Sequence, residues 1–114
     1  MERQITHGHN VTAEEAVAEL EALGLYTAVV DVPATENDFH WHDFDTIAYV
    51  LEGGLEVTEY ETGETINIVA GDRFQSGRGF VHRERHNGFK GVFGISADPA
   101  TLAMPLELPL PVTA

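Results

Sequence analysis

The sequence contains no cysteine among its 114 residues. Disulfide bonds, thiolate zinc sites and cysteine nucleophiles are therefore excluded. Six histidines and 19 acidic residues are present. Any metal ion bound by this chain must be held by histidine, carboxylate or water.

Basic residues are scarce, with six Lys and Arg against 19 acids and a formal net charge of −13 at pH 7. Nucleic acids and anionic membrane surfaces are disfavoured as partners, because their phosphates repel such a charge. Five of the six bases lie between residues 73 and 90, where Glu84 is the one acid, so that stretch carries +4 and the rest carries −17. We therefore expect a small anionic ligand, such as a carboxylate, near the basic stretch.

Long hydrophobic runs are also missing. No run approaches the roughly 18 residues of a membrane-spanning helix, and the first ten residues lack the apolar stretch of a secretory signal. These features predict a cytoplasmic protein. Apolar residues make up 43% of the chain, enough to fill the core of a single domain spanning residues 1–114.

Residues 12–23 have the pattern of one amphipathic helix. Thr12 and Glu15 have capping-box spacing, and Gly24 is placed to end the helix. Apolar residues recur at helical spacing between them, at Ala16, Val17, Leu20 and Leu23. We expect this helix to form a lid on a barrel end or on a partner subunit.

From residue 25 to about residue 97 the apolar period changes to two, which predicts an all-β barrel or sandwich. Turn signals separate short β-prone runs, and Gly53-Gly54 and Asn87-Gly88 suit tight hairpins. The predicted strands are Tyr26–Val32, Phe39–His42, Thr46–Leu51, Leu55–Tyr60, Thr65–Val69, Arg73–Gln75, Val81–His86 and Gly91–Ser96.

The C-terminal tail, residues 98–114, is predicted to be extended. Three leucines between 106 and 110 alternate with proline and glutamate, which gives one apolar face but bars the tail from a central strand. The tail is expected to lie along its own barrel or along a neighbour's. Apolar strips on the helix and the tail together predict a homodimer.

The histidines fall into three pairs. His7 and His9 lie in a polar N-terminal segment and are interpreted as incidental. His40 and His42 end a β-prone run, so their side chains point to the same face. The third pair is His82 and His86. Alternation along this strand places the Glu84 carboxylate on the same face as both histidines. If the two strands are neighbours, His40, His42 and His82 can converge on one ion with open coordination positions.

Both histidine runs carry a resemblance. The pattern His40-Trp-His42-(x)3-Thr46-(x)6-Gly53 resembles the first cupin motif, G(x)5HxH(x)3,4E(x)6G, and Tyr49-Val-Leu-Glu-Gly53 is similar to a stretch that many cupins carry there. The pattern Gly71-Asp72-(x)4-Gly77-x-Gly79-(x)2-His82-(x)3-His86 resembles the second motif, G(x)5PxG(x)2H(x)3N. The chain thus resembles small single-domain, RmlC-like cupins of the cupin-2 type. This resemblance implies a double-stranded β-helix, or jelly-roll barrel, with one N-terminal helix.

The sequence departs from these motifs at three positions. Thr46 stands at the place of the metal-ligating glutamate, Gly77 at that of the proline and His86 at that of the asparagine. The resemblance therefore implies three ligands, His40, His42 and His82, for one divalent ion of iron, manganese, nickel or zinc. The fourth ligand is left open among Asp43, Asp45, Glu84 and His86.

Several functions remain open at this stage. A metal-dependent enzyme of dioxygenase, isomerase or lyase type would use Glu84 or His86 for proton transfer, and Arg73 and Arg78 to bind an anionic substrate. The alternatives are a cupin that binds a small ligand without turnover and a purely structural barrel.

Overall fold

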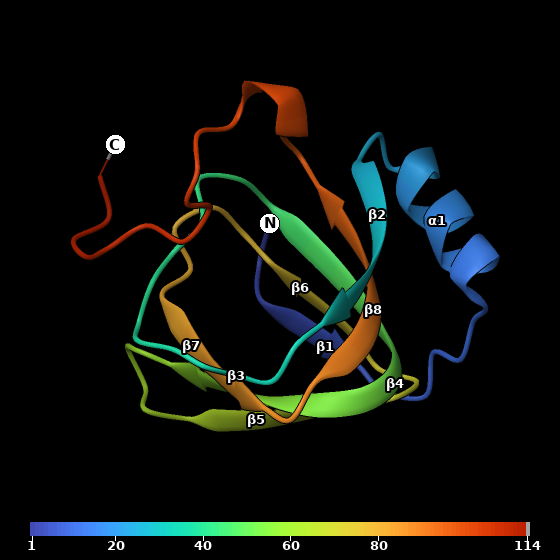
Figure 1. Ribbon diagram of the computed structural model, residues 1–114, viewed down its shortest axis with the longest axis horizontal. Coiled ribbons are helices and arrows are strands. Elements are labelled where there is room, and N and C mark those ends of the chain that lie inside the picture. The colour runs from blue at the N-terminus through green and yellow to red at the C-terminus, as the bar shows by residue number, and fades with distance from the viewer. Residues whose placement is uncertain (114) are drawn as a thin grey trace.

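Residues 1–113 are described by a computed structural model (Figure 1). Strands dominate this part of the chain, and a single α-helix packs beside them. The elements are β1 (Gln4–Thr6), α1 (Ala13–Ala22), β2 (Tyr26–Val32), β3 (Thr35–Glu36), β4 (Thr46–Glu59), β5 (Thr65–Val69), β6 (Arg73–Ser76), β7 (His82–His86), β8 (Phe89–Ile95) and a 3-10 turn (Pro99–Thr101).

The strands form a barrel of two sheets that share β4. The first half of β4 pairs with β6 and β8, and the outer partners β1 and β2 extend that sheet. The second half of β4 pairs with β5 and β7, and β3 extends the second sheet from β7. All of these pairs are antiparallel, and the sheets face each other around the interior (Figure 1). The expected all-β, jelly-roll barrel with one helix is confirmed.

The two predicted hairpins are wrong. Gly53 and Gly54 lie within the continuous strand β4, which passes from one sheet into the other there. Asn87-Gly88 connects β7 to β8, and both of these strands pair with β4. The glycines are needed for close backbone approach: a Cβ on Gly53, which has φ of +79°, would lie 2.8 Å from the Gly88 carbonyl oxygen. A glycine in the sequence is compatible with a hairpin turn and with a bend within a strand, because both conformations can require a positive φ.

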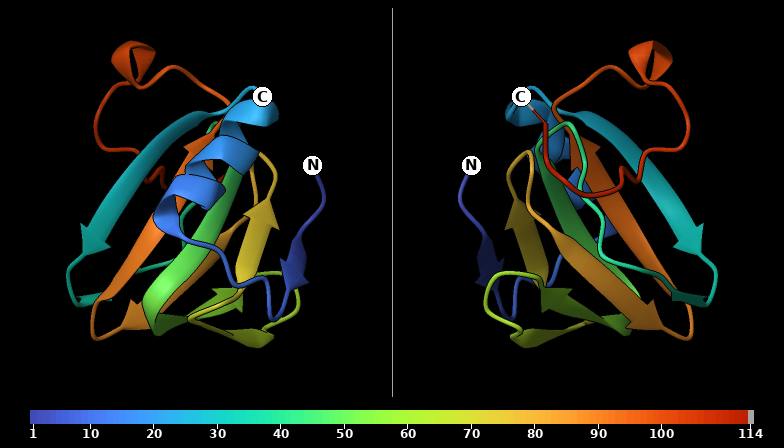
Figure 2. Two further views of the ribbon diagram at one scale, coloured as in Figure 1. Left: turned by 90° about the vertical axis from the view of Figure 1, so that its right-hand side faces the viewer. Right: turned by 90° about the vertical axis from the view of Figure 1, so that its left-hand side faces the viewer.

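Helix α1 agrees with the sequence in its bounds and its cap. Thr12 is the N-cap, and the capping box with Glu15 forms in both directions. Ala16 and Leu20 are fully buried against Tyr49 of β4 and its neighbours. Figure 2 shows the helix lying across the outer face of the β2–β8–β4 sheet, and not on a barrel end, which was one of its two predicted placements. Its apolar strip is therefore used within the chain.

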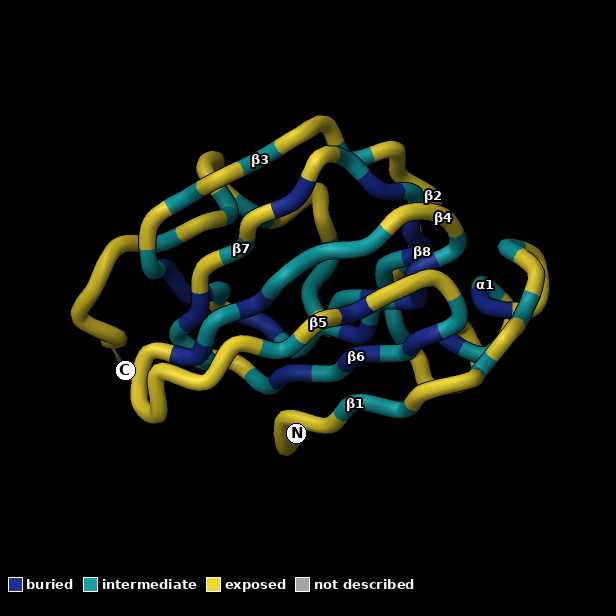
Figure 3. The backbone as a smooth tube through the Cα atoms, turned by 90° about the horizontal axis from the view of Figure 1, so that it is seen from below, coloured by how far each residue is buried: buried dark blue, intermediate teal, exposed yellow. Residues whose placement is uncertain are grey.

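Two hydrophobic clusters lie on the two sides of the larger sheet. Alternation along β4 sends Ile47 and Tyr49 outward to the helix and Val50 inward. The barrel interior is lined by the inward cluster, and Figure 3 shows this burial along the central strands. Its buried members are Val50, Val57, Ile68, Phe74 and Phe89.

Local differences from the predicted elements occur mainly outside the central strands. Phe39–His42 is not a regular strand but makes isolated bridges through His40 and Trp41. The N-terminal segment is ordered by pairing of β1 with β6. It places His7 Nδ1 3.0 Å from Asp72 Oδ1 and His9 Nε2 2.9 Å from Glu19 Oε1. Both histidines lie outside the cluster formed by His40, His42, His82 and Glu84.

The tail docks on its own barrel, which selects one of the two predicted placements. Leu108 exchanges two backbone hydrogen bonds with Trp41, and the Trp41 Nε1–H donates to the Pro109 carbonyl at 2.9 Å. A 3-10 turn at Pro99–Thr101 interrupts the predicted extended conformation, and Ala114 lies outside the described residues. Across residues 1–113, the structure contains no helix long and apolar enough to cross a membrane.

Candidate metal centre

The candidate site is built where the histidine segment crosses β7. His40 and His82 face each other in an isolated antiparallel bridge, with N···O distances of 2.9 and 3.0 Å. His42 follows two residues later, and Glu84 lies two residues after His82 on the same side of β7. Alternation along extended chain places each pair of side chains on one face. The bridge then brings the two faces together.

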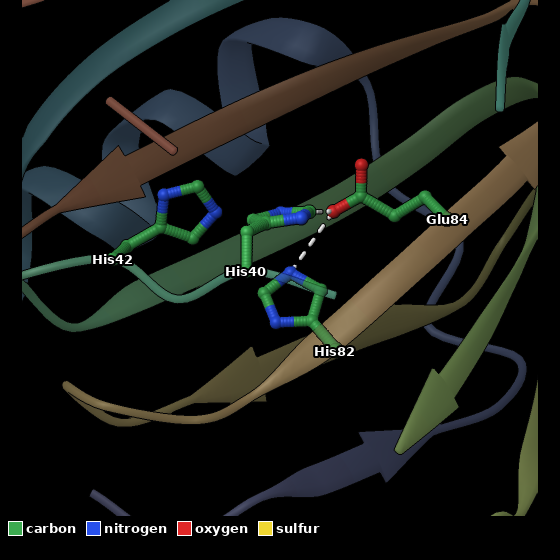
Figure 4. A group of neighbouring side chains, drawn as sticks. All are labelled: His40, His42, His82 and Glu84. Carbon is green, nitrogen blue, oxygen red and sulfur yellow. Dashed lines mark hydrogen bonds and ion pairs between the residues drawn. The ribbon is translucent and has the colours of Figure 1, made fainter. Parts of the chain in front are cut away.

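Four ligand atoms converge at this crossing. One nitrogen from each of His40, His42 and His82 and one oxygen of Glu84 all lie within 4.8 Å of one another (Figure 4). A tetrahedral ion with bonds of about 2.1 Å spaces its ligand atoms about 3.4 Å apart. Small side-chain shifts would close these four groups on one ion. The fourth ligand left open by the sequence is thus best supplied by Glu84.

The orientation of each imidazole is fixed by a backbone carbonyl. The Nδ1 atoms of His40, His42 and His82 lie 2.8, 2.9 and 2.9 Å from the carbonyl oxygens of Asp38, Leu106 and Phe80, respectively. A carbonyl oxygen only accepts, so each Nδ1 must carry the proton. In the neutral imidazoles, Nε2 then carries the lone pair. Metal-ligating histidines are commonly held by a second hydrogen bond of this kind.

The centre of the cluster contains only acceptors when its imidazoles are neutral. Glu84 Oε1 lies 2.9 Å from His82 Nε2 and 3.5 Å from His40 Nε2. His40 Nε2 is buried and has no hydrogen-bond partner of good geometry among residues 1–113. Lone pairs facing a carboxylate repel each other unless a cation lies between them. A proton or a metal ion must therefore neutralise this cluster, and the residues fit a divalent metal ion.

Charge and burial shift the pKa values of the cluster residues in different directions. Burial alone would raise the pKa of Glu84, but the nearby His40 and His82 rings, when protonated, outweigh burial by charge and hydrogen bonding and hold that pKa well below its usual range. Burial lowers the pKa of His42. Burial acts in the same direction on His40, but there the Glu84 carboxylate, the Asp38 carbonyl and Glu107 together outweigh it, and the pKa is raised. A carboxylate kept ionised suits a metal ligand better than a general acid.

A small cavity of about 90 Å³ adjoins the cluster inside the barrel. His42, His82 and Glu84 lie on its polar side, and Thr46 and Ser76 add two hydroxyls. The rest of its lining is apolar, from Ala48, Val50, Leu55, Val57, Ile68, Phe74, Phe89 and Phe93. No arginine or lysine is among these lining residues. The cavity can hold only a few non-hydrogen atoms.

His86, predicted as a proton-transfer group, lies outside the cluster. It is four residues beyond His82 on β7, about 13 Å away at the rise of a strand. Its Nδ1 accepts from the Gly88 N–H at 3.0 Å, and its ring packs on Phe89. Burial lowers its pKa. His86 thus stabilises the bend between β7 and β8.

The acidic candidates before Thr46 also lie elsewhere. Asp43 pairs with the Arg78 side chain, and Asp45 Oδ1 accepts from the Arg78 backbone N–H at 2.9 Å. Thr46 itself lines the cavity without joining the four-residue cluster. The carboxylate of the site is therefore supplied by β7 and not by the start of β4.

The structure does not bring the two predicted anion-binding arginines to the cavity. Arg73 alternates with the inward-facing Phe74, and its Nε donates to the Tyr49 hydroxyl at 3.2 Å on the helix side of the sheet. Arg78 lies outside the cavity lining, where Asp43, the Thr113 carbonyl and the Trp41 ring hold its side chain. Both guanidinium groups already have partners, so their prediction as ligand-binding residues is not supported by their placement.

Sequence reasoning missed three groups beside the cluster. Asn37 Oδ1 accepts from the Glu84 N–H at 2.7 Å, and its Nδ2 donates to Glu84 Oε2 at 3.2 Å. Glu107 Oε1 lies 4.0 Å from His40 Nε2. The Leu106 carbonyl accepts from His42. No spacing rule joins Asn37 or the tail to β7, because these contacts arise only from the folded topology.

Comparison with known proteins locates this fold among solved structures. No protein-family profile and no curated protein sequence matches the chain. A DUF861 family protein from Thermotoga maritima is 22% identical, with 81% of this chain and 97% of that chain covered and a TM-score of 0.56. A cupin-2 domain containing protein from Shewanella frigidimarina is 23% identical over 65% and 71% of the two chains, with a TM-score of 0.53.

An RmlC-like cupin from the same organism covers more of the chain. It is 19% identical over 88% of this chain and 79% of that chain, with a TM-score of 0.54. Identities this low establish the shared fold and leave the chemistry to the residues of the site. The chain therefore has the fold of a small cupin domain.

Proposed function

We propose that this protein binds one divalent metal ion through His40, His42, His82 and Glu84, and that the ion binds a small anionic molecule. The observation that carries the proposal is the orientation of the three imidazoles. Each Nδ1 donates to a carbonyl, while the Nε2 atom of His40 is buried without a hydrogen-bond partner among residues 1–113. Together with the ionised Glu84, these atoms form a cation site with room for an exogenous ligand.

The chemistry of the site follows from the metal and the cavity. A bound divalent ion would act as a Lewis acid that polarises an oxygen ligand. Because no arginine or lysine lines the cavity, attraction for an anion rests on the metal itself. The apolar walls would hold a short hydrocarbon part of the ligand and exclude water. We therefore favour a small carboxylate, with its oxygen on the metal and its apolar end in the cavity.

Two candidate functions follow from such a site: a metal-dependent enzyme that converts the bound anion, and a protein that binds the anion without turnover. Glu84 is committed to the ligand set, and His86, the other proposed proton-transfer group, lies outside the cluster. Among the four clustered side chains, none is left to move a proton. Mass spectrometry of small organic acids incubated with the metal-loaded protein distinguishes the two candidates, because only an enzyme converts one of them.

Elemental analysis of protein purified without an affinity tag tests metal binding directly. We expect about one divalent ion per chain, and loss of the ion in His42→Ala and in His82→Ala. His7→Ala and His9→Ala are matched controls, because both histidines lie outside the cluster, and they should retain the ion. Equal metal content in all four variants would refute the assignment. Thermal shifts of the metal-loaded protein with organic acids, but not with amines or neutral sugars, would support the ligand class.

A further inference from the structure

The C-terminal tail lies against one side of the candidate metal centre. Three backbone groups of residues 106–109 bind the histidine segment: the Leu106 carbonyl to His42, Leu108 to the Trp41 backbone, and the Pro109 carbonyl to the Trp41 indole. Figure 1 shows the tail crossing beside β7 and the segment before β4. The tail is thus anchored at His42 and at its neighbour Trp41.

The orientation of the His42 ring depends on a residue far away in the sequence, whereas the orientations of the His40 and His82 rings depend on nearby residues. His40 and His82 each donate to the carbonyl of a residue two positions earlier, Asp38 and Phe80. The carbonyl that accepts from His42 comes from Leu106, 64 residues away. Without this acceptor, the neutral ring could place its proton on either nitrogen. Only the tautomer protonated at Nδ1 presents Nε2 to the ion.

Glu107 adds a second carboxylate on the same side. Its Oε1 lies 4.0 Å from His40 Nε2 and accepts from Asn37 Nδ2 at 3.3 Å. The same Asn37 amide donates to Glu84 Oε2, so one side chain links the two carboxylates. The Glu107 side chain is 51% exposed, which places it at the mouth of the site. A negative charge there favours a divalent cation over the neutralising proton, because the attraction grows with charge.

We propose that residues 106–109 are part of the metal centre: the Leu106 carbonyl selects the metal-binding tautomer of His42, and Glu107 strengthens cation binding beside His40 and Asn37. Leu106 and Glu107 act as positioning and electrostatic groups through the ligands, not as ligands. This inference rests on the proposed metal site. Groups that orient metal ligands typically contribute 10- to 100-fold to metal affinity.

Two full-length variants with matched controls test the proposal. Leu108→Pro removes the N–H that donates to the Trp41 carbonyl at 2.9 Å and so loosens the tail, whereas Leu108→Ala keeps that N–H. Glu107→Gln removes the charge at the mouth, and Glu61→Gln removes an equal charge from the exposed turn after β4. Chelator competition measures the Zn²⁺ affinity of each protein. Long-range ¹H–¹⁵N spectra of the metal-free proteins report the His42 tautomer.

We expect Leu108→Pro to bind Zn²⁺ about 10- to 100-fold more weakly and to lose the uniform Nδ1-protonated form of His42. Glu107→Gln should bind about tenfold more weakly, while both controls match the wild type. If the wild type binds Zn²⁺ and both test variants match it in affinity and tautomer, the tail has no part in the centre although the metal site stands. If the wild type itself binds no Zn²⁺, the proposed function fails before the tail is tested.

Discussion

Glu84 is the residue at which this chain departs most from the motif that its histidines resemble. The motif places its carboxylate at the position of Thr46, at the start of β4. Here the carboxylate comes from Glu84 of β7. Asn37 holds this residue by accepting a hydrogen bond from its backbone N–H and donating one to its carboxylate. Thr46 still lines the cavity beside His42. The cluster thus keeps one carboxylate while changing the strand that supplies it.

This relocation predicts how substitutions at the two positions combine. Glu84→Gln should weaken Zn²⁺ binding at least about tenfold, since it removes the negative ligand while preserving side-chain size. Adding Thr46→Glu to that variant should recover part of the affinity, because a carboxylate then returns to the cavity from β4. Chelator competition on the single and double variants checks both expectations. Glu64→Gln, at an exposed position, provides the control for loss of charge, and full Zn²⁺ affinity in Glu84→Gln would contradict Glu84 as a ligand.

At the residue scale, the sequence was informative where neighbours along one strand decide the contact. Alternation placed His82 and Glu84 on one face, and both join the cluster. The same rule placed His86 on that face, but it could not show that four residues of strand carry the side chain beyond the site. Glu107 could not be predicted, because its proximity to His40 depends on the path of the whole tail.

At the scale of elements, strand runs were predicted best where alternation is uninterrupted. Tyr26–Val32 and Thr65–Val69 form strands with the predicted bounds. The hairpin predicted at Gly53-Gly54 is wrong because a glycine pair permits both a chain reversal and a bend within one strand. The long-range partners decide between them: β8 pairs with β4 up to Gly53, and β7 pairs with β4 from Glu56 onward, so β4 remains one strand and changes sheets.

The bend predicts an unequal cost for alanine at two glycines with similar backbone angles. At Gly53, with φ of +79°, a Cβ would lie 2.8 Å from the Gly88 carbonyl oxygen. Gly63 has φ of +71° but no atom within 4 Å of such a Cβ. Gly63→Ala should cost about 1 kcal/mol for the positive φ. Gly53→Ala should cost roughly 2 kcal/mol or more, because strain from the backbone contact is added.

Urea unfolding of the two variants measures this difference as a change in the free energy of unfolding. A larger loss in Gly53→Ala than in Gly63→Ala supports a bend built on close strand approach. Equal losses would show that the backbone near residue 53 relaxes freely, and the argument from the Gly88 contact would then fail.

At the scale of the whole molecule, the homodimer predicted from the sequence needs a different surface. Most of the helix strip packs on its own sheet, with Leu23 left exposed, and the tail docks on its own barrel. Strand β2 offers another surface: within residues 1–113 it pairs with β8 alone and forms an edge of the larger sheet. Three of its large apolar residues are exposed, with Tyr26 at 46%, Val29 at 49% and Val30 at 38%. An unprotected apolar edge strand of seven residues favours pairing with another strand.

We therefore expect two copies to pair through β2, and each copy carries a net charge of −13. Repulsion between such chains weakens as salt screens it, so dimerisation should strengthen between low salt and about 0.3 M salt. Multi-angle light scattering on micromolar protein measures this as a rise from the 12.5 kDa monomer mass toward twice that value. Val29→Lys should abolish the rise, because a charged edge residue blocks strand pairing. Val69→Lys, at a comparably exposed valine on β5, should dimerise like the wild type, and a dimer that survives Val29→Lys must form through another surface.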